Sequence, residues 1–479
     1  MWGLNHSLAL LDNRDIPWKQ VIVGITLGNF VFQRYLDYRQ YQVLKRKTPP
    51  ATLKAEITQE NFDKSQDYSR SKMKFKWLAS TFSVVVDLIE IKYNLIAKFW
   101  SIGGSLLTKL SPILPSFMGG PITQSLCYLF VSSVAHSLLE LPFDYYENFV
   151  VEDRYGFNKM TPKLFFTDFI KTYFVTAALV VPLVSAFLKI VDHFGSNFIL
   201  YATGLFLVFT LVVQTVYPTF IAPLFNKFEP LEEGELKIAI ENLAKEQKFP
   251  LTKLYKIDGS KRSAHSNAYF VGLPWSKQIV LYDTLIDHST TAEVVAVLAH
   301  EIGHWKLSHL PKMLAYSQAS LAFTFTLFNG FINNGSLYEA FGFNTTRPVI
   351  IGFSLFSYLF QPVQAITTFI THLLSRKHEY EADNYAKKCG FEKDLSSSLI
   401  KLTNENLSYV EAYWLYSAYH RSHPLLSERL AALNYVPSGK VGKGISPLKQ
   451  QEEEAQEQLL KKDDEKIKQR EKADGLKME

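Results

Sequence analysis

Two histidines four residues apart carry the clearest chemical signal in the sequence. His300 and His304 lie in the segment AHEIGHW, where a helix is predicted because Thr290 and Glu293 match a capping box at its start. Residues i and i+4 share one face of a helix, so both imidazoles can bind one Zn²⁺. Glu301 then lies beside the metal and can accept a proton from a bound water molecule. The alternative is a pair of histidines satisfied within a helix interface.

A catalytic zinc site needs a third protein ligand and an open fourth position. The metzincin spacing requires Gly at position 307 and His at position 310, but the chain has Leu307 and Leu310, which excludes that class. His309 is displaced by one position and is not expected to be a ligand. The third ligand is therefore expected from a second helix.

The best source of that ligand is the acidic segment RKHEYEAD at residues 376–383. Glu379 and Asp383 are i and i+4, so they share one helical face. We expect Glu379 to bind the metal and Asp383 to hydrogen-bond a ligand imidazole, which fixes its tautomer. His378 and Glu381 lie off this face and are left out of the predicted site. The alternative for the pair alone is an exposed acidic face.

The chain that must position these residues is apolar and unevenly charged. Its 479 residues are 47% hydrophobic and 14% aromatic, which excludes a disordered protein. Two cysteines exclude a disulfide framework. Uncharged or weakly charged windows predict seven membrane spans, at Gln20–Gln33, Trp77–Trp100, Leu110–Leu139, Thr172–Leu188, His193–Asn226, Met313–Tyr338 and Pro348–Ser375. The second window contains Asp87 and Glu90, so it reads either as an amphipathic soluble helix or as a span that faces a wet cavity.

The distribution of Lys and Arg predicts the orientation of the chain. The segment Arg34–Lys76 holds eleven of these residues, whereas the loops on the other side hold almost none. The positive-inside rule places this segment in the cytosol, with a lumenal N-terminus and a cytosolic C-terminus. The predicted organisation is residues 1–226 with helices one to five, 227–311 with HExxH, 312–375 with helices six and seven, 376–435 with the third ligand, and 436–479 as a charged cytosolic tail.

The cytosolic segment before the HExxH helix has the pattern of a small α+β unit. Glu232–Lys248 has helical spacing. Short strands are predicted at Leu254–Asp258, Ala268–Leu273 and Gln278–Tyr282, because Gly and Pro punctuate these runs.

Five motifs together resemble the Ste24-type CAAX prenyl protease family, a group of M48-like membrane zinc metalloproteases, and most closely its fungal members. They are HEIGH at 300–304, EYEAD at 379–383, EDRYGFN at 152–158, SNAYF at 266–270 and WLYSAYHRSHP at 414–424. The resemblance extends over most of the chain. It implies an α-helical integral membrane protein in which seven transmembrane helices surround a chamber, with a thermolysin-like zinc protease domain that contains a small β-sheet.

The resemblance also implies roles for individual residues. The zinc ligands would be His300, His304 and Glu379, and the general base would be Glu301. His423 would hydrogen-bond the oxyanion, although a structural histidine near a helix start is the alternative. Arg429 would be a supporting cation. The strand beside the substrate peptide would be formed by Asn267, Ala268, Tyr269 and Phe270, since an extended peptide can add to a sheet edge; an ordinary strand is the alternative.

The activity implied is removal of the last three residues of prenylated CAAX proteins, with a further N-terminal cleavage in a farnesylated pheromone- or lamin-type precursor. The implied location is the endoplasmic reticulum and inner nuclear membranes. Zn²⁺ is the expected cofactor, and prenylated proteins or peptides and membrane lipid are the expected partners. A net charge of +5 gives no reason to expect nucleic acid, and a monomer is expected. The alternatives are a quality-control protease for stalled or unfolded chains and a transporter-like protein with a vestigial metal site.

Overall fold

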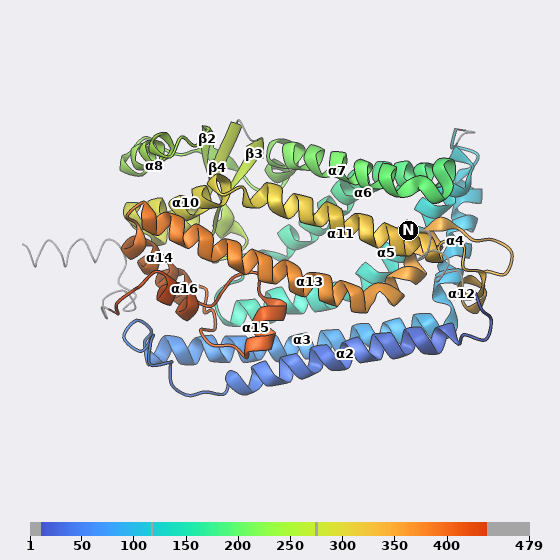
Figure 1. The fold of residues 1–479 in the computed structure, drawn as a ribbon, viewed down its shortest axis with the longest axis horizontal. Coiled ribbons are helices and arrows are strands. Elements are labelled where there is room, and N and C mark those ends of the chain that lie inside the picture. Colours follow the sequence, from blue (N-terminus) through green and yellow to red (C-terminus); the bar gives the residue numbers. More distant parts are fainter. Residues whose placement is uncertain (1–10, 116–117, 274–275, 438–479) are drawn as a thin grey trace, which may run out of the picture.

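The computed structural model describes residues 11–115, 118–273 and 276–437. The predicted charged tail at 436–479 therefore lies almost wholly outside the described residues. The molecule is elongated, and its long helices run along the long axis, with the sheet at one end (Figure 1). These helices are α2 Trp18–Val43, α3 Gln59–Tyr93, α5 Pro121–Tyr146, α6 Pro162–Phe194, α7 Phe198–Val216, α11 His309–Phe331 and α13 Val349–Lys388.

Shorter helices complete the helical part of the fold. They are α4 Leu95–Leu110, α8 Glu235–Glu246, α9 Asp283–His288, α10 Thr291–Lys306, α12 Gly335–Ala340, α14 Glu392–Glu405, α15 Trp414–His420 and α16 Leu426–Ala432. A π-helical segment, Glu147–Glu152, continues α5.

Each predicted membrane segment lies mostly on helices, but several of the segments cross a break between two helices. The segment Trp77–Trp100 is divided between α3 and α4 at Asn94, which has a left-handed conformation with φ of 53°. The segment Leu110–Leu139 begins on the last residue of α4, and its main helix, α5, starts only at Pro121. Charge alone could not locate either break, because neither the turn nor the loop needs a charged residue.

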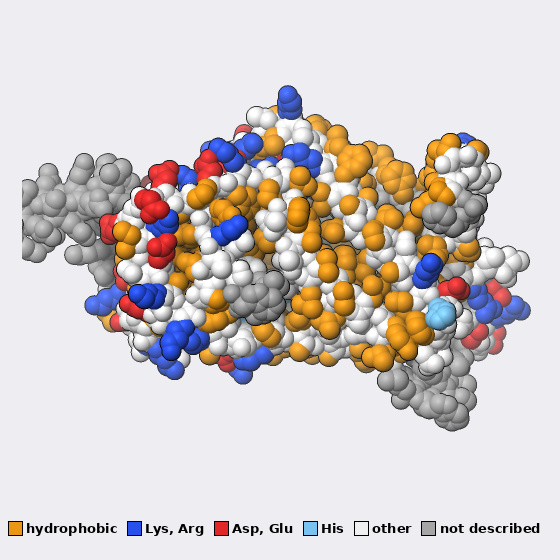
Figure 2. Space-filling model, turned by 90° about the horizontal axis from the view of Figure 1, so that it is seen from above, with side chains coloured by type: hydrophobic (Ala, Val, Ile, Leu, Met, Phe, Trp, Pro, Cys, Tyr) orange, Lys and Arg blue, Asp and Glu red, His pale blue; other side chains and the backbone are white. Residues whose placement is uncertain are grey.

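Three helical stretches of the described chain are long and apolar enough to cross a membrane, by length and composition: Pro121–Glu152, Pro162–Leu224 and Val349–Lys388. The second stretch comprises α6 and α7, which pack together on either side of Gly195, a residue with φ of 52°. The number of seven spans stays a prediction. Figure 2 shows hydrophobic side chains over the middle of one face and charged side chains at both ends, as expected for a bilayer-spanning protein.

Each end of the molecule has its own core. Aromatic residues dominate the core of the long helices, where Phe187 stacks on Phe325 with ring centroids 5.5 Å apart and Phe328 is fully buried. Aliphatic residues dominate the core around the sheet, which includes Ile240, Leu281 and Leu298. The second core anchors α10, the helix that carries the predicted zinc ligands.

The sheet has four strands: β1 Phe228–Pro230, β2 Leu251–Ile257, β3 Ala268–Leu273 and β4 Ser276–Tyr282. Their order is β1-β2-β4-β3. β2 and β4 are parallel, and the other two pairs are antiparallel, with Ala268 opposite Leu281. The predicted strand at Ala268–Leu273 has the correct bounds, while β1 was missed because three residues are too few to show a period.

The longest helix, α13, joins the membrane part to the predicted metal site. It runs for 40 residues, or about 60 Å at 1.5 Å per residue. Its first part is apolar, whereas its last turns contain Glu379 and Asp383 among its buried residues. The predicted domain boundary between residues 375 and 376 falls inside this helix.

Candidate active site

Local sequence signals place both histidines of the HExxH motif on α10. The Thr290 side chain accepts a hydrogen bond from the Glu293 backbone, and the Glu293 side chain accepts one from the Thr290 backbone, so the predicted capping box is present. The Nε2 atoms of His300 and His304 lie 3.1 Å apart. Glu301, the next residue after His300, is half-buried.

Gly303 allows a second helix to approach these histidines. A Cβ atom at this position would lie 3.2 Å from the Cα of Ala382 and 3.1 Å from the Cβ of Tyr385, both on α13. Such contacts are tighter than ordinary van der Waals packing, so a side chain here would require its neighbours on α13 to shift by a few tenths of an ångström. The glycine of the motif thus sets the distance between α10 and α13.

The close approach brings Glu379 to the two histidines. Its carboxylate oxygens lie 3.4 Å from His304 Nε2 and 3.6 Å from His300 Nε2. One ligand atom from each of His300, His304 and Glu379 falls within 4.8 Å of the others.

The geometry of these three side chains fits a zinc ion. Two imidazole nitrogens that both bind a metal at about 2.0–2.1 Å in tetrahedral geometry would lie roughly 3.3 Å apart, close to the observed 3.1 Å. Glu379 Oε2 is buried, and although His423 Nδ1 lies 2.8 Å from it, this oxygen accepts no well-aligned hydrogen bond from the described residues. Two nitrogens and one carboxylate oxygen are the donor set of catalytic zinc sites.

Burial alone would lower the pKa of His304, but a hydrogen bond to the Glu379 carboxylate and the charges of Glu301 and Glu379 outweigh it and raise that pKa. A metal must displace the proton that these carboxylates favour. Metal affinity at this site therefore depends on pH, since a ligand histidine has to be neutral.

The other ring nitrogen of His300 contacts a buried ion pair. Its Nδ1 lies 2.9 Å from Asp383 Oδ1. Arg429, on α16, holds both oxygens of that carboxylate, at 2.8 Å from Nε and 2.6 Å from Nη2. The structure thus brings Asp383 to a histidine nitrogen that faces away from Glu379, and it brings Arg429 to Asp383.

The other ring nitrogen of His304 contacts a residue that the sequence analysis set aside. His304 Nδ1 lies 2.9 Å from His309 Nδ1, and His309 Nε2 lies 2.9 Å from Glu381 Oε2. His309 reaches this place because Ser308, with φ of 57°, turns the chain between α10 and α11. No spacing rule signals such a turn, so neither His309 nor Glu381 could be assigned to the site from the sequence.

His309, His378 and Glu381 also lie close enough together to suggest a second metal site. The rings of His309 and His378 are stacked, with centroids 4.1 Å apart and an interplanar angle of 7°. The lone pairs of an imidazole lie in the plane of its ring, so parallel stacked rings cannot direct them at one ion. We therefore interpret this group as a support for His304.

His423 also contacts Glu379, and its side chain is 60% exposed. Its Nδ1 is 2.8 Å from Glu379 Oε2. Arg376 on α13 holds the backbone of this segment: it donates to the His423 carbonyl at 3.3 Å and forms an ion pair with Glu428 at 2.9 Å. The sequence analysis missed this role of Arg376 because it joins residues that are far apart in the chain.

The predicted peptide-binding strand is the last strand of the described sheet. β3 pairs with β4 on one side only, so Ala268, Tyr269 and Phe270 belong to an edge strand, as expected. Asn267 precedes the strand and is exposed, and its side chain accepts a hydrogen bond from the Ala268 backbone. An edge of this kind has main-chain groups available for an added strand.

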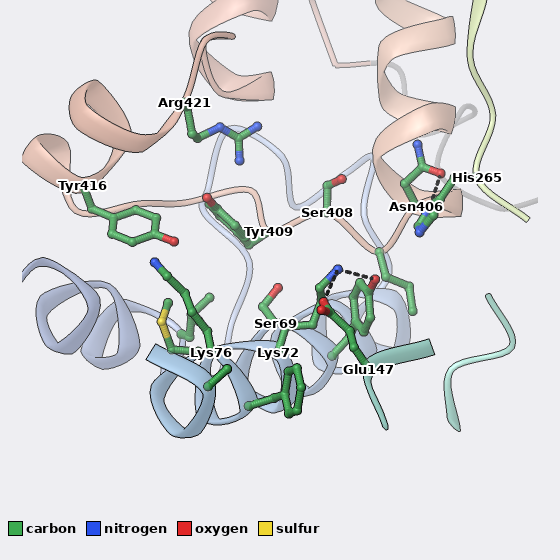
Figure 3. A pocket seen from close by; sticks show the side chains of 16 residues that line it. Ser69, Lys72, Lys76, Glu147, His265, Asn406, Ser408, Tyr409, Tyr416 and Arg421 are labelled. Carbon is green, nitrogen blue, oxygen red and sulfur yellow. Dashed lines mark hydrogen bonds and ion pairs between the residues drawn. The ribbon is translucent and has the colours of Figure 1, made fainter. Parts of the chain in front are cut away.

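A cavity of about 640 Å³ lies between α3 and the segment that leads into α15 (Figure 3). Its lining includes Lys72, Lys76 and Arg421. Lys72 pairs with Glu152 and Lys76 with Asp37, each at 2.7 Å, whereas no acidic residue of the described chain forms an ion pair with Arg421. His265, which precedes Asn267 by two residues, also lines this cavity.

An HExxH helix, a glutamate from a second helix and long apolar helices define a zinc metallopeptidase embedded in a membrane. Comparison with known proteins identifies its family. The family model for the CAAX prenyl protease N-terminal region with five membrane helices matches residues 40–227, and the model for peptidase family M48 matches residues 230–436. The chain belongs to the M48 family of peptidases, in its CAAX prenyl protease group.

Named relatives cover nearly the same length. The chain is 45% identical to CAAX prenyl protease 1 of Saccharomyces cerevisiae, over 90% of this chain and 98% of that protein. It is 37% identical to the human CAAX prenyl protease 1 homolog, over 88% and 96% of the two chains. The crystal structure of Ste24p from S. mikatae matches with a TM-score of 0.84 and 44% identity, over 88% of this chain and 100% of that chain.

Proposed function

We propose that this protein is a zinc endopeptidase that removes the C-terminal tripeptide of prenylated CAAX proteins. The convergence of His300, His304 and Glu379 on one position carries the proposal. Membership of the M48 family and the names of the relatives supply the substrate class. We also propose the further N-terminal cleavage in a farnesylated precursor.

The residues of this chain divide the chemistry among themselves. His300, His304 and Glu379 would hold Zn²⁺, which when bound would supply Lewis-acid chemistry for water and for the scissile carbonyl. Glu301 accepts the proton of the attacking water and returns it to the leaving amine. His423 donates a hydrogen bond to the carbonyl oxygen as negative charge develops, which is typically worth about 3 kcal/mol. Asn267 and the edge of β3 hold the peptide extended.

The position of the cavity suits the end of the substrate chain. Arg421 and His265 line the cavity, and they precede His423 and Asn267 by two residues each. A tripeptide that carries a free carboxylate would find in Arg421 a cation without an acidic partner. We place the C-terminal end of the substrate in this cavity, with the peptide antiparallel to β3.

A peptide with a C-terminal amide tests this placement. The wild-type protein should show a KM about tenfold higher for the amide than for the free acid, which corresponds to about 1.4 kcal/mol. Arg421→Gln should remove the difference between the two peptides. If the wild-type protein cleaves both with the same KM, the carboxylate is not held there, although the peptidase assignment stands.

We propose the endoplasmic reticulum and inner nuclear membranes as the location, with the N-terminus lumenal, the active site cytosolic and the protein monomeric. The basic segment Arg34–Lys76, which runs from the end of α2 through the first half of α3, supports this orientation. Membrane lipid is then a neighbour of the apolar surface shown in Figure 2.

The decisive experiment is incubation of the purified protein with a farnesylated CAAX peptide, with and without a chelator. We expect release of the tripeptide, loss of activity with chelator and recovery with added zinc. Cleavage of unfolded chains but not of the farnesylated peptide would favour quality control. About one zinc per chain supports the enzyme, whereas a metal-free and inactive chain would contradict it.

A further inference from the structure

His309 is buried against His304, a proposed zinc ligand, and is not itself among the three proposed ligands. Only 2% of its surface is exposed. Its ring stacks on His378, its Nδ1 lies 2.9 Å from His304 Nδ1, and its Nε2 lies 2.9 Å from Glu381 Oε2. Glu381, His309 and His304 therefore form a continuous chain of contacts, from the partly exposed carboxylate of Glu381 to the proposed metal position.

Metal binding at His304 fixes the direction of every hydrogen bond along this line. His304 binds through Nε2, so its Nδ1 carries the hydrogen and donates. His309 Nδ1 must then accept, which leaves the hydrogen of the neutral His309 ring on Nε2. That hydrogen is donated to the Glu381 carboxylate, an acceptor with no competing hydrogen of its own.

We propose that His309 and Glu381 are positioning residues that hold His304 in the tautomer and ring orientation required for zinc. The inference rests on the proposed function, because it takes His304 as a ligand. Glu381 selects the tautomer of His309, and His309 in turn selects that of His304. Partners of this kind are typically worth 10–100-fold in metal affinity.

Zinc affinity of the purified full chain, measured by competition with a chelator, tests the proposal directly. His309→Leu should weaken binding about 10–100-fold, because Leu has no acceptor for His304 Nδ1–H. His309→Asn should restore most of the affinity, since the amide oxygen of Asn occupies nearly the place of imidazole Nδ1. A residue that acts only by filling space would be replaced better by Leu than by Asn.

The same comparison applies at Glu381. Glu381→Gln keeps an acceptor for His309 Nε2–H and should bind zinc within about threefold of the wild type, whereas Glu381→Ala should lose about tenfold. Lys377→Ala is the control, because Lys377 is 3.8 Å from Glu381 and removing it changes the local charge without touching His309. The unfolding temperature in excess chelator should be unchanged in all five variants, which separates metal positioning from folding.

Two results would overturn the proposal: equal zinc affinity of His309→Leu and wild type, or a lower affinity of His309→Asn than of His309→Leu. Failure of the proposed function would look different, because the wild-type protein would then bind no zinc or cleave no farnesylated peptide. The positioning roles and the peptidase assignment can therefore fail independently.

Discussion

The two histidines of the metal site are supported in different ways. His300 contacts Asp383, whose side chain is 1% exposed. Asp383 forms an ion pair with Arg429, whose side chain is 11% exposed. His304 contacts His309, which in turn contacts Glu381, whose side chain is 36% exposed. One support is a buried charge pair, and the other is a neutral ring that ends in an acid at the surface.

Because of this difference, removing a supporting residue should cost a different amount of folding free energy on the two sides. Removing one member of a buried ion pair leaves an uncompensated charge, which costs about 3–5 kcal/mol. Removing an acid that water can reach costs much less, because water replaces the lost partner. The His300 side should therefore affect both stability and metal affinity, and the His304 side mainly metal affinity.

Loss of a zinc ligand should have the largest effect on zinc binding and cleavage, and the effects of changes in the two supports can be compared with it. Glu379→Ala should abolish both zinc binding and cleavage, because a catalytic zinc site needs three protein ligands and only the two histidines would remain. Metal analysis and peptide assay on one preparation measure this. Glu241→Ala, at an exposed position on α8, is the control. Retention of about one zinc in Glu379→Ala would show that the third ligand is another residue.

Loss of the proposed base should separate catalysis from metal holding. Glu301 shares α10 with both histidines but belongs to neither support. Glu301→Ala should abolish turnover and leave zinc affinity close to that of the wild type, because Glu301 moves a proton and is not a ligand. Substantial residual cleavage by this variant would refute the assignment.

Arg429→Met should have the larger effect of the changes on the His300 side. It leaves the Asp383 carboxylate buried without its cation, so the free energy of unfolding should fall by about 3–5 kcal/mol. Thermal unfolding in excess chelator measures this without the contribution of the metal. An unchanged unfolding temperature would mean that the ion pair contributes little to stability.

Asp383→Asn should be milder, since Asn keeps the size and can still accept a hydrogen bond from His300 Nδ1, and Arg429 keeps a second carboxylate, that of Glu379, at 3.6 Å. We expect zinc affinity or turnover to fall about 10–100-fold without complete loss. Zinc titration, followed by turnover at saturating zinc, separates the two contributions. Unchanged values for both would mean that Asp383 does not support the ligand.

Salt should have the smallest effect and should distinguish the two sides. Ionic strength of about 1 M shortens the Debye length to about 3 Å, which screens exposed charges but not buried ones. The ratio of zinc affinities between wild type and Glu381→Gln should therefore move toward one in high salt. The ratio between wild type and Asp383→Asn should stay constant. A salt-dependent Asp383 ratio would contradict the distinction between the supports.

Much of the metal site could be predicted from short-range patterns. The capping box, the i, i+4 pair in HEIGH and the shared face of Glu379 and Asp383 are local features of helices, and the structure places all of them as expected. Whether these residues bind zinc is a prediction that the experiments above will test. The edge strand Ala268–Leu273 was also correct, because its bounding residues are strong turn formers.

The parts that were missed depend on contacts between distant segments or on single turns. His309 was set aside because it is one position from where the metzincin spacing requires a histidine, but Ser308 turns the chain just after α10 and brings His309 back to His304. Glu381 was left out because it points away from the Glu379 face, and that direction leads to His309. The last membrane span was predicted to end at Ser375 because charges begin at Arg376, and charge alone did not show that the same helix continues to Lys388.

The continuity of α13 has a consequence for how the protein can be handled. One continuous helix provides both the apolar surface that faces lipid and the carboxylates Glu379 and Asp383. Truncating the gene near codon 376 to obtain a soluble catalytic fragment would interrupt this helix. The part of α13 that aligns Glu379 with α10 would then be lost. The peptidase should therefore have no active form without a membrane or a membrane mimic, and any inhibitor screen has to use the intact protein in a micelle, nanodisc or vesicle.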